Sequence, residues 1–104
     1  MAKIEAYIYV PEDVQLPTLY ETEDIPEEEK ILHLKFFTPD DNWTWYVAEY
    51  DPEKRLFFGY VEGDFPEWGY FSLDELKSVR GPLGLPVERD LYFKPTKFKD
   101  LSKY

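Results

Sequence analysis

Three runs of aromatic and β-branched residues, separated by short polar connections, constrain the fold of this chain more than any other feature. The runs cover residues 31–37, 43–50 and 55–61, and residues of these types favour β-strands. The connections at 38–42 and 51–54 contain Pro, Asp and Asn, which favour tight turns. Because connections this short join antiparallel neighbours, the centre of the chain is predicted to form an antiparallel meander.

The flanking segments predict further, shorter strands. Residues 3–10 alternate between apolar and polar side chains, as a half-buried strand does, whereas residues 12–29 are interrupted by prolines and predict a loop with at most one short helical turn. Additional strands are predicted at 69–71 and 87–93. Gly59, inside the third aromatic run, indicates a bulge or the close approach of another chain segment.

One short helix is predicted after residue 72. Ser72, with Glu75 three positions later, is the signature of a capping box, and the run Arg80-Gly81-Pro82 ends the helix. An apolar stripe that can pack on the sheet consists of Leu73, Leu76 and Val79. The loop at 81–86 is expected to be ordered, because its prolines restrict the backbone and Leu83 and Leu85 are expected to enter the core.

These elements together predict the fold class. The chain of 104 residues is the length of one domain. We expect an α+β fold in which one short helix packs on an antiparallel sheet of about five strands. The single domain spans residues 1–104, with its folded core at 3–93 and a Lys-rich tail at 94–104.

The residue types that the chain lacks exclude several kinds of site. There is no cysteine, which removes disulfides, thiolate metal sites and thiol nucleophiles. The single histidine, His33, occupies a polar position of an alternating run, which predicts an exposed side chain on a sheet face and not a general base or a metal ligand. The run Asp40-Asp41-Asn42 is explained by turn formation. We therefore predict no metal and no cofactor.

Charge narrows the class of partner. The formal net charge is −10, and nucleic-acid affinity depends largely on Lys and Arg contacts with phosphates, so no nucleic-acid partner is expected. Residues 89–104 carry +3, which leaves −13 for residues 1–88, and residues 21–29 alone contain six acids. Such a block is typical of a solvated surface, with imitation of DNA by an inhibitor as a further hypothesis.

Hydropathy bears on location. No apolar run approaches the roughly 18 residues of a membrane span, and no signal-peptide pattern follows Met1. We therefore expect a cytoplasmic protein without a membrane partner.

Two groups of residues are candidates for a site. Glu88, Arg89 and Asp90 place two carboxylates beside a guanidinium, and Arg80 and Glu67 could converge on them. These charges either fix the 81–86 loop or recognise a peptide or small ligand, and a small hydrolase or ligand-binding enzyme at these five residues is the alternative function. The second group consists of the aromatic residues, among which Trp43 and Trp45 either pack in the core or form a protein-binding surface.

Several stretches of the sequence, one of them long, match a recurring pattern of residues. Residues 65–93 read FPEWGYFSLDELKSVRGPLGLPVERDLYF, and shorter matching strings are LPTLY at 16–20, KFFTPD at 35–40, WTW at 43–45 and FFG at 57–59. The chain thereby resembles a family of small uncharacterised proteins, catalogued as a domain of unknown function and common on bacterial plasmids, phages and integrative elements. The resemblance implies a fold and a mobile-element setting, but no activity. We therefore predict a non-enzymatic accessory protein that acts through protein–protein contacts.

Overall fold

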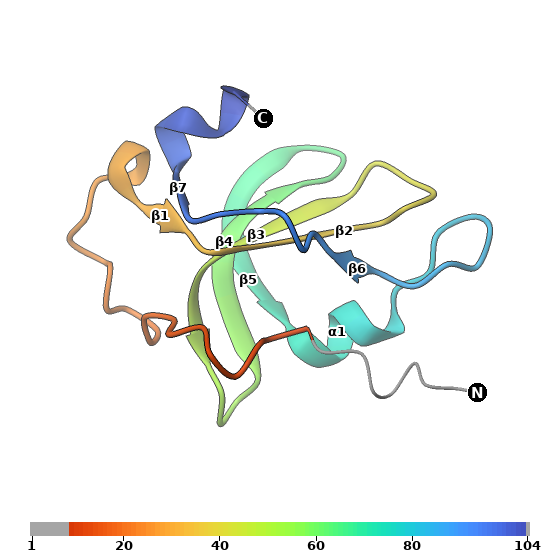
Figure 1. The fold of residues 1–104 in the computed structure, drawn as a ribbon, viewed down its shortest axis with the longest axis horizontal. Coiled ribbons are helices and arrows are strands. Elements are labelled where there is room, and N and C mark those ends of the chain that lie inside the picture. Colours follow the sequence, from red (N-terminus) through yellow and green to blue (C-terminus); the bar gives the residue numbers. More distant parts are fainter. Residues whose placement is uncertain (1–8, 104) are drawn as a thin grey trace.

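A computed structural model describes residues 9–103, and its main feature is a five-stranded antiparallel sheet with the strand order β5-β4-β3-β2-β6 (Figure 1). The strands are β2 (Leu34–Phe37), β3 (Thr44–Asp51), β4 (Leu56–Glu62), β5 (Pro66–Ser72) and β6 (Glu88–Arg89). One α-helix, α1 (Leu73–Ser78), packs beside β5. The predicted α+β domain, with about five antiparallel strands and one short helix, is confirmed.

The outer strands differ in detail from the predicted ones. Of the strand predicted at 3–10, residues 3–8 lie outside the described part of the chain, and Tyr9 and Val10 form a bend. The fifth strand of the sheet is β6, which is shorter than the predicted run 87–93 because the chain turns away after Arg89. Asp90 forms that turn, since its carboxylate accepts the N–H of Tyr92 at 2.9 Å.

A small second sheet divides the first aromatic run at His33. It pairs β1 (Ile31–Leu32) with β7 (Thr96–Lys97), while the rest of the run continues as β2 in the main sheet. His33 is half-buried, so the predicted exposed side chain is wrong, and burial lowers its pKa. Two 3-10 helices, η2 (Glu27–Glu29) and η3 (Phe98–Lys103), lie beside this second sheet.

The irregularity expected at Gly59 is present in the pairing of β3 with β4. The register shifts between Val47 and Glu49, which leaves Ala48 as an extra residue opposite Gly59 and Phe58. A Cβ atom at Gly59 would lie 1.7 Å from the carbonyl oxygen of Tyr46. Glycine at this position is therefore required by the close approach of the neighbouring backbone.

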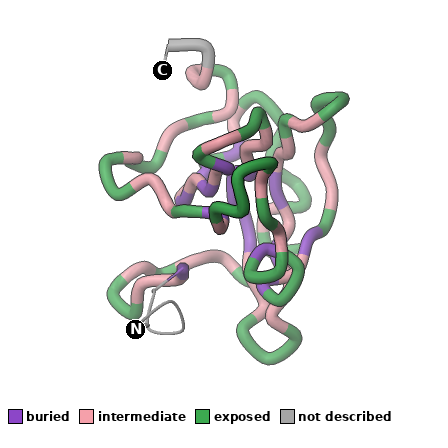
Figure 2. The backbone as a smooth tube through the Cα atoms, turned by 90° about the vertical axis from the view of Figure 1, so that its right-hand side faces the viewer, coloured by how far each residue is buried: buried purple, intermediate pink, exposed green. Residues whose placement is uncertain are grey.

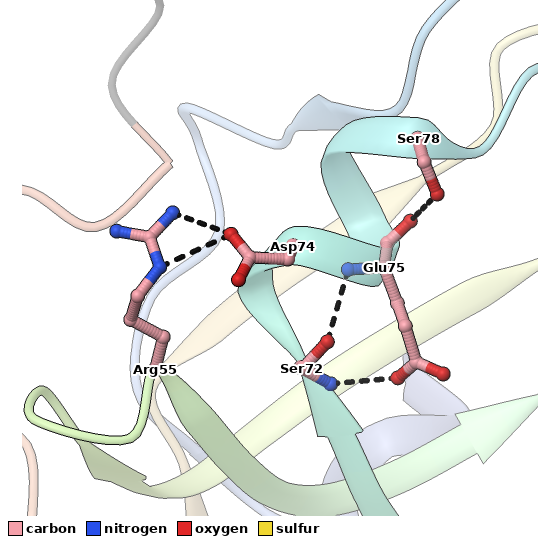
Figure 3. A network of polar contacts seen from close by, with 5 residues as sticks. All are labelled: Arg55, Ser72, Asp74, Glu75 and Ser78. Carbon is pink, nitrogen blue, oxygen red and sulfur yellow. Dashed lines mark hydrogen bonds and ion pairs between the residues drawn. The ribbon is translucent and has the colours of Figure 1, made fainter.

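The capping box predicted for the helix is formed as expected (Figure 3). The Ser72 hydroxyl accepts the Glu75 N–H and the Glu75 carboxylate accepts the Ser72 N–H, both at 2.9 Å. Arg55, which precedes β4, donates to Asp74 in the first helical turn at 2.7 Å. Leu73 and Leu76 are buried against the sheet. The capping box and this burial together stabilise a helix that would be too short to form by itself.

Both faces of the main sheet carry apolar clusters, and Figure 2 shows the buried segments concentrated in its interior. The first cluster, which α1 and the segment starting at Tyr9 cover, includes Phe36, Val47, Phe57, Phe71, Leu76 and Val87. The second cluster joins Tyr46 and Ala48 of β3 to Leu32 of β1, and its cover comes from Phe93, Phe98 and Leu101. In Figure 1, α1 and the C-terminal segment accordingly lie on opposite sides of the sheet.

The segment predicted as a Lys-rich tail is packed onto the sheet. The ring of Phe98 lies 4.7 Å from that of Tyr60 and 5.1 Å from that of Trp68, measured between centroids. Lys97 and Lys99 pair with the carboxylate of Glu29 at 2.9 and 3.0 Å. The boundary placed after residue 93 is therefore not the end of the folded structure, because apolar side chains between the lysines hold the segment in place.

The loop at 81–86 is held differently from the expectation. Leu83 and Leu85 are 79% and 42% exposed, so neither enters the core as predicted. The loop is closed by the hydrogen bond from the Gly81 N–H to the Leu85 carbonyl at 3.1 Å, and the buried contact is made by Val87 just after it. Polar backbone contacts thus replace the expected apolar ones.

A buried carboxylate fixes the N-terminal connection. Glu49, on β3, accepts the N–H groups of Tyr20 and Thr22 at 2.8 and 3.0 Å and also the Thr22 hydroxyl. Tyr20 has a φ of 72°, which the surrounding hydrogen bonds maintain. The acidic segment 21–29 is thereby held beside the sheet at its first residues.

Among the described residues, no helix has the length and apolar character that crossing a membrane requires.

Candidate functional site

A cavity of about 680 Å³ opens beside β6, at the edge of the main sheet. Its walls come from β2, from the turn between β2 and β3 and from residues 88–92. Because β6 pairs with β2, residues 88–92 face the turn at 38–43 although about fifty positions separate them in the chain. The cavity volume is in the range typical of sites for small ligands.

The wall formed by residues 88–92 is fixed by backbone pairing. Arg89 lies opposite Phe36, and the Asp90 N–H donates to the Lys35 carbonyl at 2.9 Å. Val87, immediately before β6, is buried, and its carbonyl accepts the hydroxyl of Tyr9 at 2.9 Å. The charged side chains that follow Val87 therefore start from a well-ordered backbone.

The opposite wall depends on Trp43. Its backbone N–H donates to the buried Thr38 hydroxyl at 3.0 Å, and its carbonyl accepts the Thr38 N–H at 3.0 Å. The indole ring stacks on Trp45 with centroids 5.8 Å apart and covers Gly63, where a Cβ atom would collide with the ring. Trp43 is thus held in one orientation, and it belongs to the lining of the cavity.

Charged groups of both signs line this space. Lys35 pairs with Asp90 at 3.8 Å, and its ammonium lies 5.9 Å from the centre of the Tyr46 ring. Arg89 and Lys35 face the cavity together with Asp41, Glu88 and Asp90. Such a mixed lining suits a ligand that carries both donors and acceptors, as peptides do.

Tyr46 lies beneath this ion pair. Burial raises its pKa to about 12, and the carboxylates of Glu62 and Asp90 contribute to the same direction. The phenol is therefore a neutral hydrogen-bonding group at physiological pH and not a base.

The rim of the cavity carries two exposed apolar side chains. Leu91 is 66% exposed and Tyr92 is 89% exposed, and both belong to the cavity lining. Large apolar side chains this exposed are candidates for contact with a partner, particularly where they surround a concave and ordered surface.

The structure brings together some of the candidate residues and separates others. Glu88, Arg89, Asp90 and Trp43 meet at the cavity. Arg80 does not, since its guanidinium donates to the carbonyls of Lys77 and Val79, at the end of α1. This is a helix-terminating role.

Glu67 and Trp45 line a different cavity. It measures about 420 Å³ and lies between β5 and α1. Trp45 is buried in the core. The five charged residues of the alternative enzyme site are therefore divided between separate places in the fold. No group of three or more His, Asp or Glu side chains in residues 9–103 is arranged to hold a metal ion.

Among the members of the site that sequence reasoning missed are Lys35, Leu91, Tyr92 and also Asp41, which it assigned only to a turn. Lys35 had a usable signal, because its position in the alternating run places it on the face opposite Phe36. Its pairing with Asp90 depends on the alignment of β2 with β6, which no local pattern encodes.

Comparison with known proteins gives one family. The family model described as "Protein of unknown function (DUF2958)" matches residues 16–104. No curated protein and no solved structure matches the chain.

Proposed function

The chain belongs to the DUF2958 family of proteins of unknown function, and from the geometry of its own residues we propose that it is a non-enzymatic binding protein that engages a protein partner at the cavity beside β6. The observation that carries this proposal is the position of Leu91 and Tyr92. Both are largely exposed at the rim of a cavity whose walls are fixed by hydrogen bonds and strand pairing.

The residue types support a protein partner. Tyr, Trp and Arg are enriched where binding energy concentrates in protein interfaces, and such residues gather around well-packed pockets. Here Tyr92 and Leu91 would contact the partner surface, while a partner side chain enters the cavity against Trp43. Lys35, Arg89 and Glu88 would then select the polar groups around that side chain.

The mobile-element setting is part of the proposal. The resemblance to plasmid and phage proteins implies it, and we infer an accessory role in such an element. The net charge of −10 supports a protein partner over nucleic acid, because it opposes association with phosphates.

A second candidate is a small ligand-binding protein or hydrolase. The observation that favours it is the cavity volume of about 680 Å³ with carboxylates from Asp41, Glu88 and Asp90 in one lining. It lacks Glu67 and Arg80, which lie elsewhere, so the ligand would be held by residues of the β6 wall alone.

The test is affinity capture from the native host with three forms of the protein. The wild type is compared with the double variant Leu91→Ser, Tyr92→Ser and with the control Ile25→Ser, which changes an exposed side chain of the acidic segment 21–29. In Figure 1 this segment, drawn in orange before β1, lies on the side of the molecule opposite to β6. A photoreactive residue introduced at Tyr92 identifies what lies directly against the rim.

The expected result is a stoichiometric protein that crosslinks at position 92, is retained by the control variant and is lost with the double variant. Equal retention by the double variant would contradict the proposed site. Absence of a protein partner, together with thermal stabilisation of the wild type by a small molecule from the same extract, would favour the second candidate.

A further inference from the structure

At the end of the sheet opposite to β6, the outer edge of β5 is paired with no strand of the described residues. Arg55 and Leu73 form a hydrogen-bonded pair, since the Leu73 N–H donates to the Arg55 carbonyl at 2.9 Å. Hydrogen-bonded pairs alternate along an antiparallel ladder, so Phe71, Gly69 and Glu67 bond to β4 in the same way. The N–H and C=O groups of Trp68 and Tyr70 consequently point outward from the edge.

The neighbouring positions limit the open edge to these residues. Pro66 has no N–H, and the N–H of Ser72 is taken by Glu75 in the capping box. No other strand among residues 9–103 pairs with the outer side of β5. The edge therefore offers a short pairing site with fixed bounds, and not a continuous unprotected strand.

One face of this edge borders an apolar groove. The cavity of about 420 Å³ between β5 and α1 is lined mainly by Trp45, Val61, Phe71, Leu76 and Val79. Gly69 belongs to the same lining, and nothing is within 4 Å of the position that a Cβ atom there would take. A side chain from a segment paired with β5 would find room in this groove.

The other face of the edge presents aromatic rings. Trp68 stacks on Phe58 with centroids 5.7 Å apart, and Tyr70 lies 5.1 Å from Phe58 and is 52% exposed. The pKa of Tyr70 is raised by burial first, then by its hydrogen bond with Tyr20 and by nearby carboxylates. An exposed tyrosine ring beside a half-buried tryptophan, with carboxylates nearby, attracts cationic side chains.

The charge of this region has one sign. Residues 62–76 contain five acids and no Lys or Arg. Asp74 is neutralised by Arg55 and Glu75 serves the capping box, but Glu62, Asp64 and Glu67 are exposed without such a role in the described structure. The edge therefore favours a positively charged partner over a neutral or acidic one.

We propose that β5 accepts an extended, basic segment of a partner protein as an added strand, with its apolar side chains in the groove over Gly69 and its Lys or Arg side chains over Trp68 and Tyr70. Because successive side chains of a strand point to opposite faces, a segment in which apolar and basic residues alternate places its apolar side chains in the groove and its basic side chains over the aromatic rings. Trp43 lines both this groove and the cavity beside β6, but the strand edge and the space over Gly69 belong to β5 at the other end of the sheet, so the proposal does not rest on the proposed function.

The test uses a fluorescein-labelled octapeptide in which Lys or Arg alternates with Val, titrated with the full chain at ~150 mM salt. Three further peptides are compared with it. One carries Glu in place of the basic residues, and two are N-methylated, either at the basic residues or at the valines. Strand addition requires the N–H groups of one of these two sets.

Two variants probe the protein side. Gly69→Leu fills the groove, and the open space around Gly69 allows the chain to fold. Tyr70→Pro removes one outward N–H without breaking a bond to β4. Leu91→Ser, at the opposite edge, serves as the control variant, and circular dichroism verifies the fold of each.

We expect saturable binding of the basic peptide, at least about tenfold weaker binding of one N-methylated peptide and of both β5 variants, and unchanged binding to Leu91→Ser. Equal binding of both N-methylated peptides would overturn strand addition, even if Tyr70→Pro does not fold. If the basic peptide binds Gly69→Leu as tightly as the wild type, its side chains do not enter the groove over Gly69. If the Glu peptide binds the wild type as tightly as the basic peptide does, the partner segment need not be basic.

Discussion

The carboxylate of Asp40, in the turn between β2 and β3, accepts the backbone N–H of Leu83 at 2.7 Å. The same carboxylate lies 1.6 Å from the position that a Cβ atom at Gly81 would occupy. One side chain thus holds the 81–86 loop, whose leucines are exposed, against the turn that forms a wall of the cavity beside β6.

Removing this contact should loosen the loop and destabilise the fold. We expect Asp40→Ala to lower the free energy of unfolding by roughly 1–3 kcal/mol, because the Leu83 N–H loses its acceptor. Urea denaturation measures the change, and Glu53→Ala, in the exposed turn between β3 and β4, is the control. Equal stability of both variants would show that the loop does not depend on Asp40.

The contrast between Leu76 and Leu85 tests where the core lies. Leu76 on α1 is 1% exposed, so Leu76→Ala should cost about 2–5 kcal/mol, as truncation of other buried leucines does. Leu85 is largely outside the core, and Leu85→Ala should cost well under about 1 kcal/mol. Urea denaturation of the two variants measures both changes. A larger loss of unfolding free energy in Leu85→Ala than in Leu76→Ala would contradict the exposed position of Leu85.

Glu29 should make attachment of the C-terminal segment sensitive to acid. Hydrogen bonds from Lys97 and Lys99 lower the pKa of Glu29 below its ordinary value near 4.5. A carboxyl group with a lowered folded-state pKa contributes stability above its ordinary pKa, and this contribution is lost as pH falls through the folded-state value. The segment is therefore expected to loosen in acid.

Hydrogen exchange at the Phe98 N–H, which donates to the Lys30 carbonyl at 2.8 Å, reports this attachment. In the wild type, its protection should fall as the pH drops below about 4.5. Glu29→Gln should show weaker protection already at neutral pH, whereas the neighbouring Glu28→Gln should resemble the wild type. If Glu29→Gln retains full protection at neutral pH, the ion pairs do not hold the segment.

Local signals explain what the sequence could predict. The meander follows from runs of β-forming residues and the turns between them, and the capping box needs only Ser72 and Glu75, three positions apart. Gly59 was informative because glycine inside a strand has few other reasons to occur. Each of these features is decided by neighbours in the chain.

Long-range contacts explain most of the features that the sequence could not predict. Phe98 contacts Trp68, and Lys97 pairs with Glu29, only where the folded sheet brings them together, so the Lys-rich composition alone predicts a tail. At the cavity, Glu88, Arg89, Asp90 and Trp43 were identified by residue type. Arg80 is an exception, because the contact that keeps it away from the cavity is local: its guanidinium donates to the carbonyls of Lys77 and Val79, which residue type alone does not reveal.

The facing glycines of β4 and β5 provide the sharpest test of the sheet. Gly59 and Gly69 are paired in the ladder, yet their surroundings differ. A Cβ atom at Gly59 would meet the Tyr46 carbonyl oxygen at 1.7 Å, a backbone atom that cannot move without breaking the β3–β4 pairing, whereas Gly69 has open space. Neither glycine has a positive φ, so the difference is one of space.

Gly59→Ala should therefore cost at least about 3 kcal/mol, in the range of other severe backbone conflicts. Gly69→Ala should leave stability unchanged or raise it by up to about 1 kcal/mol, because alanine restricts the unfolded chain more than glycine does. The free energies of unfolding of the two variants, measured by urea denaturation under the same conditions, test both values. Similar losses in the two variants would mean that β3 and β4 do not approach as closely as the bulge at Ala48 requires, or that the β5 face is not open.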